Sequence, residues 1–592
     1  MCGIFGYVGK KNEGARIVFK GLKELEYRGY DSWGIASVTL KDPRKFYLIK
    51  KTGKIGNFDS SELPKSSLSL GHTRWATHGG VTQENAHPHL DCSQTIAVIH
   101  NGIIENFQEI KDPLLKEGHH FESETDTEVA AHLIEKFSKN SSFDEAVRKT
   151  FRQIKGLNAI AAINLKEKTI VAARNGSPLV VGFGRNENFL ASDATALSPY
   201  TKEVYYLSEN ELAIISQEKI IIKNVISVKI LTVRKQKIDW SYKDTTTGKY
   251  PHFMIKEINE QPKVLLNILE NFEADVKRLA NEIKKAEDII WVGCGTAGNA
   301  ALAGKYLFSK IAGVKSDAVL GSEFCYFGKN LDKKSLPIFL SQSGETIDIV
   351  QPASELKKRG IKIAALINRL GSSLYRISDT KILLGAGPEI CVLSTKVFTA
   401  KLAVLLLTAF ALKGKLSDGK RELESAIIQS QKILSKEYFE KYLKKLIPAL
   451  KEKQNIFTIG RGLFYPIALE AALKIKEVTY LHVEGLAGGE LKHGVIALIE
   501  NGLPAIVFAP NDETYNDIIS NATEIKARSG TIIGISHKNH EVFDYFLPLA
   551  DSKEATIIPA IIIIHLIGYH LALALKRDPD KPRNLAKSVT VK

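Results

Sequence analysis

The second half of the chain repeats one pattern, a short buried strand that ends in a glycine turn and continues as a helix. The first copy starts Asp288-Ile289-Ile290-Trp291-Val292-Gly293-Cys294-Gly295, and the second starts Asn455-Ile456-Phe457-Thr458-Ile459-Gly460-Arg461-Gly462. In each copy Leu-Pro introduces a second strand, at residues 336–340 and 503–507, and a third strand follows at 361–368 and 531–536. Buried strands that alternate with helices predict parallel sheets, with sites where strand ends meet helix starts. The repeat therefore predicts two tandem α/β domains, at residues 286–420 and 450–577.

The N-terminal third follows a different pattern. Short β-type runs succeed one another between residues 35 and 222, and two clear helical patterns interrupt them, at residues 15–25 and 127–137. Many short strands with few helices predict an α+β domain with stacked antiparallel sheets. We expect this domain to span residues 2–239, followed by a linker and helix at 240–285.

Composition narrows the classes of protein. Five scattered cysteines without a CxxC motif favour a reducing, cytoplasmic setting over a disulfide framework or a structural zinc site. The net charge of +15 is spread in short pairs, without the long basic block of a nucleic-acid-binding protein. The apolar run Thr556–Leu575 contains Pro559 and His565, which favours a buried helix over a membrane span. We expect no metal, no cofactor, no nucleic acid and no membrane as partner.

The start of the chain supplies a candidate nucleophile. Cys2 follows Met1 directly, and removal of Met1 would leave a thiol and a free α-amine on one residue. An α-amine titrates near ~7.7–8.0 and a thiol near ~8.5, so the amine can take the thiol proton close to neutral pH. The alternative is that Cys2 is an ordinary small residue at a chain start.

Five polar clusters interrupt the strand pattern of the first third, at residues 27–32, 72–79, 85–89, 100–106 and 123–127. Each has a structural explanation by itself, since Asn101-Gly102 is a common hairpin turn and Thr125-Asp126 can cap the next helix. Together they supply an arginine for a carboxylate, a carboxylate for an ammonium group and donors for an oxyanion. A thiol that cleaves an amide needs these groups.

These motifs resemble the class II glutamine amidotransferase domain, an N-terminal-nucleophile hydrolase with an αββα sandwich. The resemblance rests on Cys2-Gly3-Ile4, Arg28-Gly29, Thr73–Gly79, Asn85–Pro88, His100–Gly102 and Glu124–Thr127. It implies that Cys2 attacks the glutamine amide and that Asn101 and Gly102 form the oxyanion hole. It also implies glutamine contacts from Arg74 to the carboxylate and Asp126 to the ammonium, an ammonia gate at Trp75, and further contacts at Thr77, His78 and His87.

A second polar segment, Ser341-Gln342-Ser343-Gly344-Glu345-Thr346, lies between a strand and the helical pattern at 347–358. Hydroxyls and backbone amides at a helix start form a cradle that suits a phosphate. The equivalent segment of the second copy is Ala509-Pro510-Asn511-Asp512-Glu513-Thr514. Proline and two acids there predict that the second copy has no phosphate pocket. Alternatively, both copies are only scaffold.

The two copies resemble sugar isomerase (SIS) domains, and the whole order, ending in a tail at 578–592, resembles the glucosamine-6-phosphate synthase family. The resemblance implies that L-glutamine and D-fructose 6-phosphate become L-glutamate and D-glucosamine 6-phosphate, with ammonia channelled between two sites. It implies a Schiff base at Lys587, proton transfer by Glu477, and ring opening by His493 from the partner subunit of a homodimer. It also implies assistance from Lys474 and sugar-phosphate contacts from Thr296, Ser341, Gln342, Ser343, Thr346 and Ser394.

The chain departs from the family pattern near the phosphate site. The family commonly has serine where Ala297 stands, and Cys391 and Leu393 also replace more usual residues, so sugar-phosphate affinity is where we expect a difference. Two other functions would need different features. A phosphoribosyl pyrophosphate amidotransferase would need a phosphoribosyltransferase domain in place of the repeats, and a sugar-phosphate-binding regulator would need neither Cys2 nor Lys587.

Overall fold

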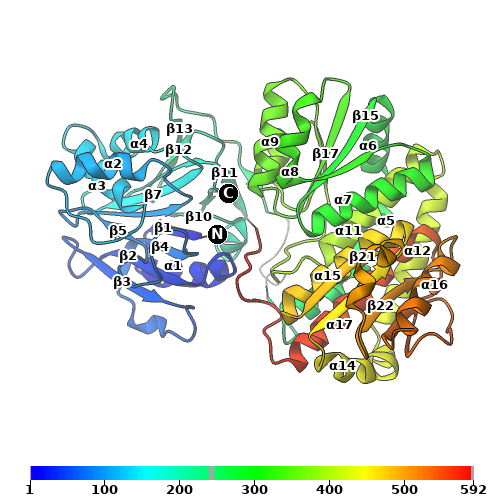
Figure 1. Cartoon of the computed structure of the whole chain (residues 1–592). Helices are drawn as coiled ribbons and strands as arrows, with labels where there is room; N and C mark the ends of the chain where they lie inside the picture. The colour runs from blue at the N-terminus through cyan, green and yellow to red at the C-terminus, as the bar shows by residue number, and fades with distance from the viewer. Residues whose placement is uncertain (1, 239–245, 589–592) are drawn as a thin grey trace. The chain divides into compact units, whose positions relative to one another are not determined.

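The computed structural model describes residues 2–238 and 246–588. It divides into two compact units (Figure 1). The first unit comprises the described residues of Met1–Thr246, Glu345–Ile347 and Ala586–Lys592, and the second comprises Thr247–Gly344 and Asp348–Leu585. Met1 and the predicted domain boundary at residues 239 and 240 lie outside the described residues, so the removal of Met1 stays a prediction.

The first unit contains two antiparallel sheets. The eight-stranded sheet runs in the order β14-β11-β9-β10-β1-β4-β2-β3, and the six-stranded sheet in the order β13-β12-β8-β7-β6-β5. The strands are β1 Gly3–Gly9, β2 Ser32–Thr39, β3 Phe46–Thr52, β4 Ser66–Arg74, β5 His89–Leu90, β6 Ile96–Asn101, β7 Asn158–Asn164, β8 Ile170–Asn175, β9 Val180–Phe183, β10 Glu187–Ala191, β11 Glu203–Tyr206, β12 Glu211–Ile215, β13 Ile220–Asn224 and β14 Gln236–Lys237. The helices are α1 Gly14–Leu25, α2 Phe107–Lys116, α3 Glu128–Ser138 and α4 Phe143–Gln153.

Three hydrophobic clusters separate the layers of this unit. In β1, Ile4 and Val8 belong to the cluster between the two sheets, whereas Phe5 and Tyr7 belong to the cluster under α1. This is the alternation that a strand buried on both faces requires. The third cluster lies between the six-stranded sheet and helices α3 and α4. The order helix, sheet, sheet, helix confirms the predicted αββα sandwich.

The second unit contains two parallel five-stranded sheets with one topology. Their orders are β16-β15-β17-β18-β19 and β21-β20-β22-β23-β24, so in each copy the first strand lies between the second and the third. The strands are β15 Asp288–Gly293, β16 Asp317–Leu320, β17 Ser335–Ser341, β18 Ala364–Ile367, β19 Thr380–Leu383, β20 Asn455–Gly460, β21 His482–Ala487, β22 Pro504–Ala509, β23 Thr531–Ser536 and β24 Tyr545–Pro548. The predicted duplication of a parallel α/β unit is confirmed.

Thirteen helices surround these two sheets in the described chain. They are α5 Phe253–Asn271, α6 Glu273–Lys285, α7 Thr296–Leu307, α8 Gly321–Phe327, α9 Ile347–Lys358, α10 Ser373–Ile377, α11 Lys396–Leu412, α12 Leu416–Ile433, α13 Lys436–Tyr438, α14 Lys444–Lys451, α15 Tyr465–Thr479, α16 Tyr515–Lys526 and α17 Ile557–Ala574.

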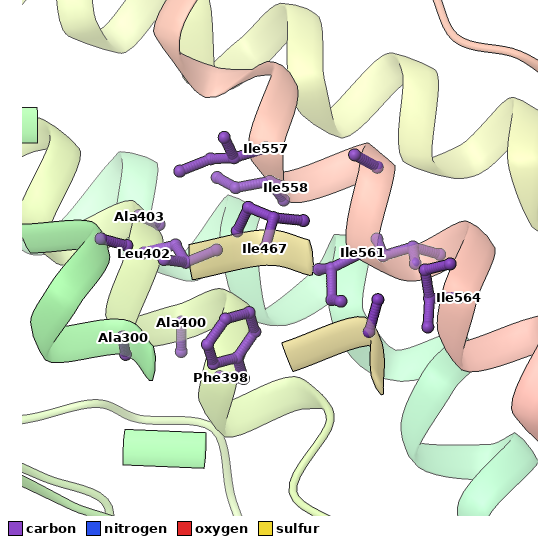
Figure 2. Close-up of a cluster of buried hydrophobic side chains, with 14 of the residues drawn as sticks. Ala300, Phe398, Ala400, Leu402, Ala403, Ile467, Ile557, Ile558, Ile561 and Ile564 are labelled. Atoms are coloured by element: carbon purple, nitrogen blue, oxygen red, sulfur yellow. The ribbon is translucent and has the colours of Figure 1, made fainter. Parts of the chain in front are cut away.

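One large hydrophobic cluster joins the two copies. Figure 2 shows its centre, where Phe398 and Leu402 of α11, Ile467 of α15 and Ile561 of α17 meet. Helix α17 belongs to the stretch Lys553–Ala574, which is long and apolar enough to cross a membrane, yet 83% of its apolar part is buried in the protein. It is therefore the core helix that the sequence predicted.

The glycine turns have the same physical cause in both copies. A Cβ on Gly293 would lie 2.4 Å from the backbone of Ala297, and a Cβ on Gly460 would lie 2.2 Å from the carbonyl oxygen of Phe464. Only glycine lets the following helix start this close to the strand. The helix starts are thereby fixed at the carboxyl ends of β15 and β20.

Candidate active sites

The first candidate site surrounds Cys2 at the end of β1. Because β1 pairs with β4, with Gly3 opposite Thr73, Cys2 lies beside the residues that follow β4. The Cys2 thiol donates to the Trp75 carbonyl oxygen at 3.6 Å, and its sulfur accepts the Trp75 N–H at 3.3 Å. Antiparallel pairing therefore places the predicted nucleophile and the predicted gate residue side by side.

Two side chains hold the backbone of Cys2. Its carbonyl oxygen accepts hydrogen bonds from Arg28 Nε at 3.1 Å and from Asn101 Nδ2 at 3.0 Å. Burial raises the pKa of the Cys2 thiol, and the Trp75 N–H and the charges of Arg74 and Arg28 only partly offset it. The thiol is therefore protonated at rest and needs a base, the role predicted for its α-amine.

A histidine fixes the orientation of Asn101. His72 Nε2 lies 3.0 Å from Asn101 Oδ1 and 2.9 Å from the carbonyl oxygen of His100. Since both partners are acceptors, Nε2 carries the proton. Burial lowers the pKa of His72 to about 3, so the ring is neutral. The hydrogen bond from His72 to Asn101 Oδ1 fixes the amide so that its nitrogen faces Cys2.

The predicted glutamine-binding charges lie in the same region. Arg74 ends β4 and donates to the carbonyl oxygens of Gly80 at 3.0 Å, Gly79 at 3.2 Å and His78. Burial lowers the pKa of Arg74, and the opposing interactions come from Cys2, Asp31 and Asp126. Asp126 accepts the N–H of Ile104 at 2.6 Å.

The remaining predicted glutamine contacts differ in burial. His87 is buried and stacks on His72 with ring centres 4.1 Å apart, so it supports the site from behind. Trp75 packs edge-on against Tyr30, with ring centres 5.6 Å apart. His78 packs against Phe107, and Thr77 is exposed on the same loop.

Gly102 has a conformation that other residues avoid. Its φ is +135°, and a Cβ would lie 2.3 Å from the carbonyl oxygen of Leu157. The chain therefore turns sharply directly after Asn101, where the oxyanion hole is predicted.

The second candidate site lies at the carboxyl ends of β15 and β17. These strands are neighbours, so Thr296, the first residue of α7, and the segment after Ser341 lie at the same edge of the sheet. Ser341 Oγ accepts the N–H of Gly344 at 2.9 Å. Gly344 has φ +65°, and a Cβ there would lie 2.1 Å from Ser372 Oγ. Glycine and serine thus close a tight turn in front of α9.

The other predicted phosphate contacts differ in exposure. Ser341 and Ser343 are buried, while Gln342 is half-buried. Ser394 Oγ is buried and has no hydrogen-bond partner within the described part of the chain. An unpaired buried hydroxyl costs free energy, which a bound ligand would recover. Thr346 belongs to the segment grouped with the first unit, so its role stays a prediction.

Helix α15 carries a buried ionic network. Lys474 Nζ lies 2.6 Å from Glu477 Oε2 and 3.6 Å from Glu470 Oε1. Lys474 and Glu470 are almost fully buried, whereas the Glu477 side chain is 20% exposed. Glu470 also accepts a hydrogen bond from Asn299 of α7 at 2.8 Å. The more accessible of the two carboxylates is thus the one predicted to move the proton.

Burial and charge set the protonation of this network. Burial raises the pKa of Glu470 to about 7, although Lys474 and Asn299 act against it. Burial by itself would lower the pKa of Lys474, but the carboxylates of Glu477 and Glu470 outweigh it and the pKa is raised. Lys474 is therefore a cation at neutral pH and holds Glu477 in place.

Two other predicted catalytic residues, His493 and Lys587, lie outside helix α15. His493 is exposed at the end of the short helical segment η9, Gly488–His493. Lys587 lies in the segment Ala586–Lys592, which is grouped with the first unit. The approach of either residue to Glu477 stays a prediction.

Comparison with known proteins identifies the family. A family model described as the SIS domain matches residues 282–411 and 449–544, and one described as a glutamine amidotransferase domain matches residues 72–199. The glutamine–fructose-6-phosphate aminotransferases (isomerizing) of Pyrococcus horikoshii and Thermococcus kodakarensis are each 40% identical to this chain, and each match covers 100% of this chain and 100% of the relative. The chain belongs to this aminotransferase family.

A solved structure agrees with the aminotransferase assignment. The C-terminal domain of glucosamine-fructose-6-phosphate aminotransferase from Francisella tularensis is 32% identical, with a TM-score of 0.52. The match covers 57% of this chain and 99% of that chain. It supports the two tandem sugar isomerase folds of the second unit.

The structure of this aminotransferase chain adds residues for which no role was predicted. His72 orients Asn101, and Glu470 and Asn299 extend the network of Lys474. The helical spacing of Glu470, Lys474 and Glu477 would have placed all three on one face of α15. Nothing in the sequence indicates the bond between His72 and Asn101, because the two residues lie on strands of different sheets.

Proposed function

We propose that the chain converts L-glutamine and D-fructose 6-phosphate into L-glutamate and D-glucosamine 6-phosphate in the cytoplasm. The observation that carries this proposal is the end-to-end match to relatives named glutamine–fructose-6-phosphate aminotransferase (isomerizing). The thiol site at Cys2 and the strand-end site with its buried ionic network supply the two halves of that chemistry. Ammonia released in the first half is channelled to the second.

The first half is hydrolysis of the glutamine amide. The α-amine of Cys2 takes the thiol proton, and the sulfur attacks the side-chain carbonyl carbon. Asn101 Nδ2 and the N–H of Gly102 stabilise the oxyanion of the tetrahedral intermediate. Collapse breaks the C–N bond as the α-ammonium group passes its proton to the leaving nitrogen, which departs as ammonia, and water then hydrolyses the thioester to glutamate. Arg74 and Asp126 bind the carboxylate and ammonium of glutamine, with Trp75, Thr77, His78 and His87 around them.

The second half is amination and isomerisation of the sugar. Ser341, Gln342, Ser343 and Thr346, with Thr296 and Ser394, bind the phosphate, and His493 of a homodimer partner opens the ring. Lys587 forms a Schiff base with the ketone and releases water. Ammonia then displaces the lysine amine from C2, and Glu477 moves a proton between C1 and C2. The ammonium of Lys474 supports Glu477 in this role. The exposure of His493 is compatible with its use by a partner subunit.

The domain division at 2–239, 240–285, 286–420, 450–577 and 578–592 is part of this proposal. The antiparallel sandwich and the two parallel sheets lie within the first, third and fourth of these ranges. The tail at 578–592 carries Lys587 and enters the sugar site.

Separate assays of the two halves test the proposal. Wild-type protein given both substrates should yield glutamate and hexosamine 6-phosphate in equal amounts, as measured by mass spectrometry. Cys2→Ala should abolish both products from glutamine but retain slow conversion of the ketose phosphate to the aldose phosphate. Lys587→Arg should retain glutaminase activity and make no amino sugar. Cys325→Ala, at an exposed cysteine of α8, is the matched control. Normal amino-sugar synthesis by either active-site variant would contradict the proposal.

A further inference from the structure

Four potential metal ligands converge in the first unit, among residues to which the proposed reaction assigns no role. Cys92 lies in the turn between β5 and β6, His119 in the loop after α2, and His132 and Glu135 on α3. One ligand atom from each lies within 4.8 Å of the other three. Three segments that are distant in the sequence thus bring a thiol, two imidazoles and a carboxylate together.

The separations fit a tetrahedral ion. Cys92 Sγ lies 3.5 Å from His119 Nδ1 and 3.4 Å from His132 Nδ1. Glu135 Oε2 lies 3.1 Å from His119 Nδ1 and 3.7 Å from His132 Nδ1. Zn–S bonds of ~2.3 Å and Zn–N or Zn–O bonds of ~2.0–2.1 Å at tetrahedral angles give ligand separations of ~3.3–3.6 Å. Four of the six separations are therefore close to those of a zinc site, and all six are within 4.8 Å.

The opposite nitrogen of His132 faces a carboxylate at a distance longer than a hydrogen bond. His132 Nε2 faces Glu128 Oε1 at 3.6 Å, and both side chains are buried. This arrangement favours a proton on Nε2 and leaves the lone pair of Nδ1 directed at the cluster. Glu128 is held in turn by the N–H groups of Glu122 and Ser123, each at 2.7 Å. A carboxylate that orients a ligand histidine is the usual outer shell of a zinc site.

Backbone donors support the other two ligand types. The N–H of His120 donates to Cys92 Sγ at 3.4 Å, and the N–H of Cys92 donates to Glu135 Oε2 at 3.3 Å. The ring of Phe121 covers His132, with ring centres 4.3 Å apart. Cys92 is exposed, which leaves a route for the ion from solvent.

We propose that Cys92, His119, His132 and Glu135 bind one zinc ion. A thiolate with two imidazoles selects zinc over magnesium or calcium, and four protein ligands leave no open position for catalysis. The ion is structural: it fastens the loop that runs from His119 to the start of α3. That loop includes Asp126, so zinc also supports the predicted ammonium contact of the glutamine site.

The sequence had predicted no structural zinc site, because the ligands do not have the usual spacing. The usual zinc signature has closely spaced pairs of ligands, but Cys92 is 27 residues from His119 and 40 from His132. Only His132 and Glu135, three residues apart on one helix face, form a local pair.

Metal analysis of the full chain, produced without a histidine tag, tests the site. The protein is loaded with Zn²⁺, dialysed against metal-free buffer and measured by plasma mass spectrometry. We expect about one zinc per chain, as for a closed site of four protein ligands. Cys92→Ser and His132→Asn should each lose most of it. Cys325→Ser, which removes another exposed cysteine, should keep it.

Cobalt gives a second readout that needs no activity. Co²⁺ bound at the site should show a thiolate-to-metal charge-transfer absorption in wild type and Cys325→Ser, and none in Cys92→Ser. A chelator should lower the melting temperature of wild type but not of Cys92→Ser, because only a bound ion stabilises the folded state. Two outcomes would overturn the proposal: wild-type protein that holds no stoichiometric zinc after loading, and Cys92→Ser that binds as much zinc as Cys325→Ser. Both can be measured even if His132→Asn fails to fold. The glutamine assay is not involved, so this result is independent of the proposed function.

Discussion

The two parallel sheets of the second unit share one strand order but differ in the chemistry at their carboxyl ends. In the first copy, the segment after β17 is a turn of hydroxyl residues in which Ser341 Oγ accepts the N–H of Gly344. In the second copy, the segment after β22 carries Asp512, whose carboxylate accepts the N–H of Thr514 at 2.9 Å. Lys310 of the first copy lies 3.7 Å from Asp512 and 3.0 Å from Glu513. Acids therefore occupy the position that corresponds to the hydroxyl turn of the first copy, and the lack of a phosphate pocket there stays a prediction.

The helices that follow β15 and β20 also differ, and here it is the second copy that carries the ionisable side chains. Counted from Gly295 and Gly462, the positions of Glu470 and Lys474 in α15 correspond to Ala303 and Leu307 of α7. Both of these are fully buried. One copy thus offers an anion cradle and the other offers buried acid–base groups. The duplicated fold supplies two equivalent strand ends, and the side chains decide what each one does.

The largest effect expected from this division is on Glu477. Glu477→Gln keeps the hydrogen bond to Lys474 but removes the proton carrier, so the rate of sugar isomerisation should fall by about 10²–10⁴-fold. Glutaminase activity should stay within about twofold of wild type, since that chemistry is proposed at Cys2. Lys310→Gln, at the equivalent position of the first copy, is the matched control. The comparison fails if both variants isomerise the sugar equally well.

The next largest effect concerns the stability of the network. Lys474→Met leaves two carboxylates near each other in the core without their cation, and breaking a buried ion pair in this way costs about 3–5 kcal/mol. Leu307→Met, at the matched apolar position of α7, should cost less than about 1.5 kcal/mol. Calorimetry of the unfolding transition of the second unit gives both changes in the free energy of unfolding. Equal melting temperatures would show that Lys474 is not held by charge.

A pH dependence should follow from Glu470. Its pKa is raised from 4.5 to about 7 by burial, so the folded protein holds a proton that the unfolded chain releases between these values. This contribution to the free energy of unfolding should therefore decrease as pH rises from 4.5 to 7 and be constant above, with a slope of at most about 1.4 kcal/mol per pH unit.

Glu470→Gln isolates this contribution. The difference in melting temperature between wild type and this variant should change across that pH window and level off above pH 7. A difference that does not vary with pH would mean that Glu470 is ionised throughout. The first copy has Ala303 at this position and contributes no such titration.

The smallest effect expected is on sugar-phosphate affinity. Ser343→Ala should raise the KM for fructose 6-phosphate by about 10–100-fold, which is the loss of one hydrogen bond to a charged group. Asn511→Ala, at the corresponding exposed position of the second copy, should leave KM unchanged. Steady-state kinetics at saturating glutamine distinguish the two. Equal increases in KM would mean that both strand ends bind the sugar phosphate.

The alternation of apolar residues was sufficient to predict most of the elements. Strand β23 and helix α9 have the predicted bounds, and β17 lies within one residue of prediction at each end. Strands β4 and β10 were not predicted, although they flank β1 and so position Cys2. β4 contains Gly71, and β10 starts with Glu187 and Asn188, which are residue types depleted in strands.

The sequence by itself determined the kinds of group available: a thiol after Met1, a hydroxyl turn at a strand end and a duplicated α/β pattern. These are local properties, because a motif and its helix or strand lie within a few residues of each other. Tertiary structure alone decided which groups meet, such as His72 with Asn101, and Cys92 with His119 and His132. The physical reason is that these contacts join distant segments, whose approach depends on sheet pairing and core packing rather than on local spacing.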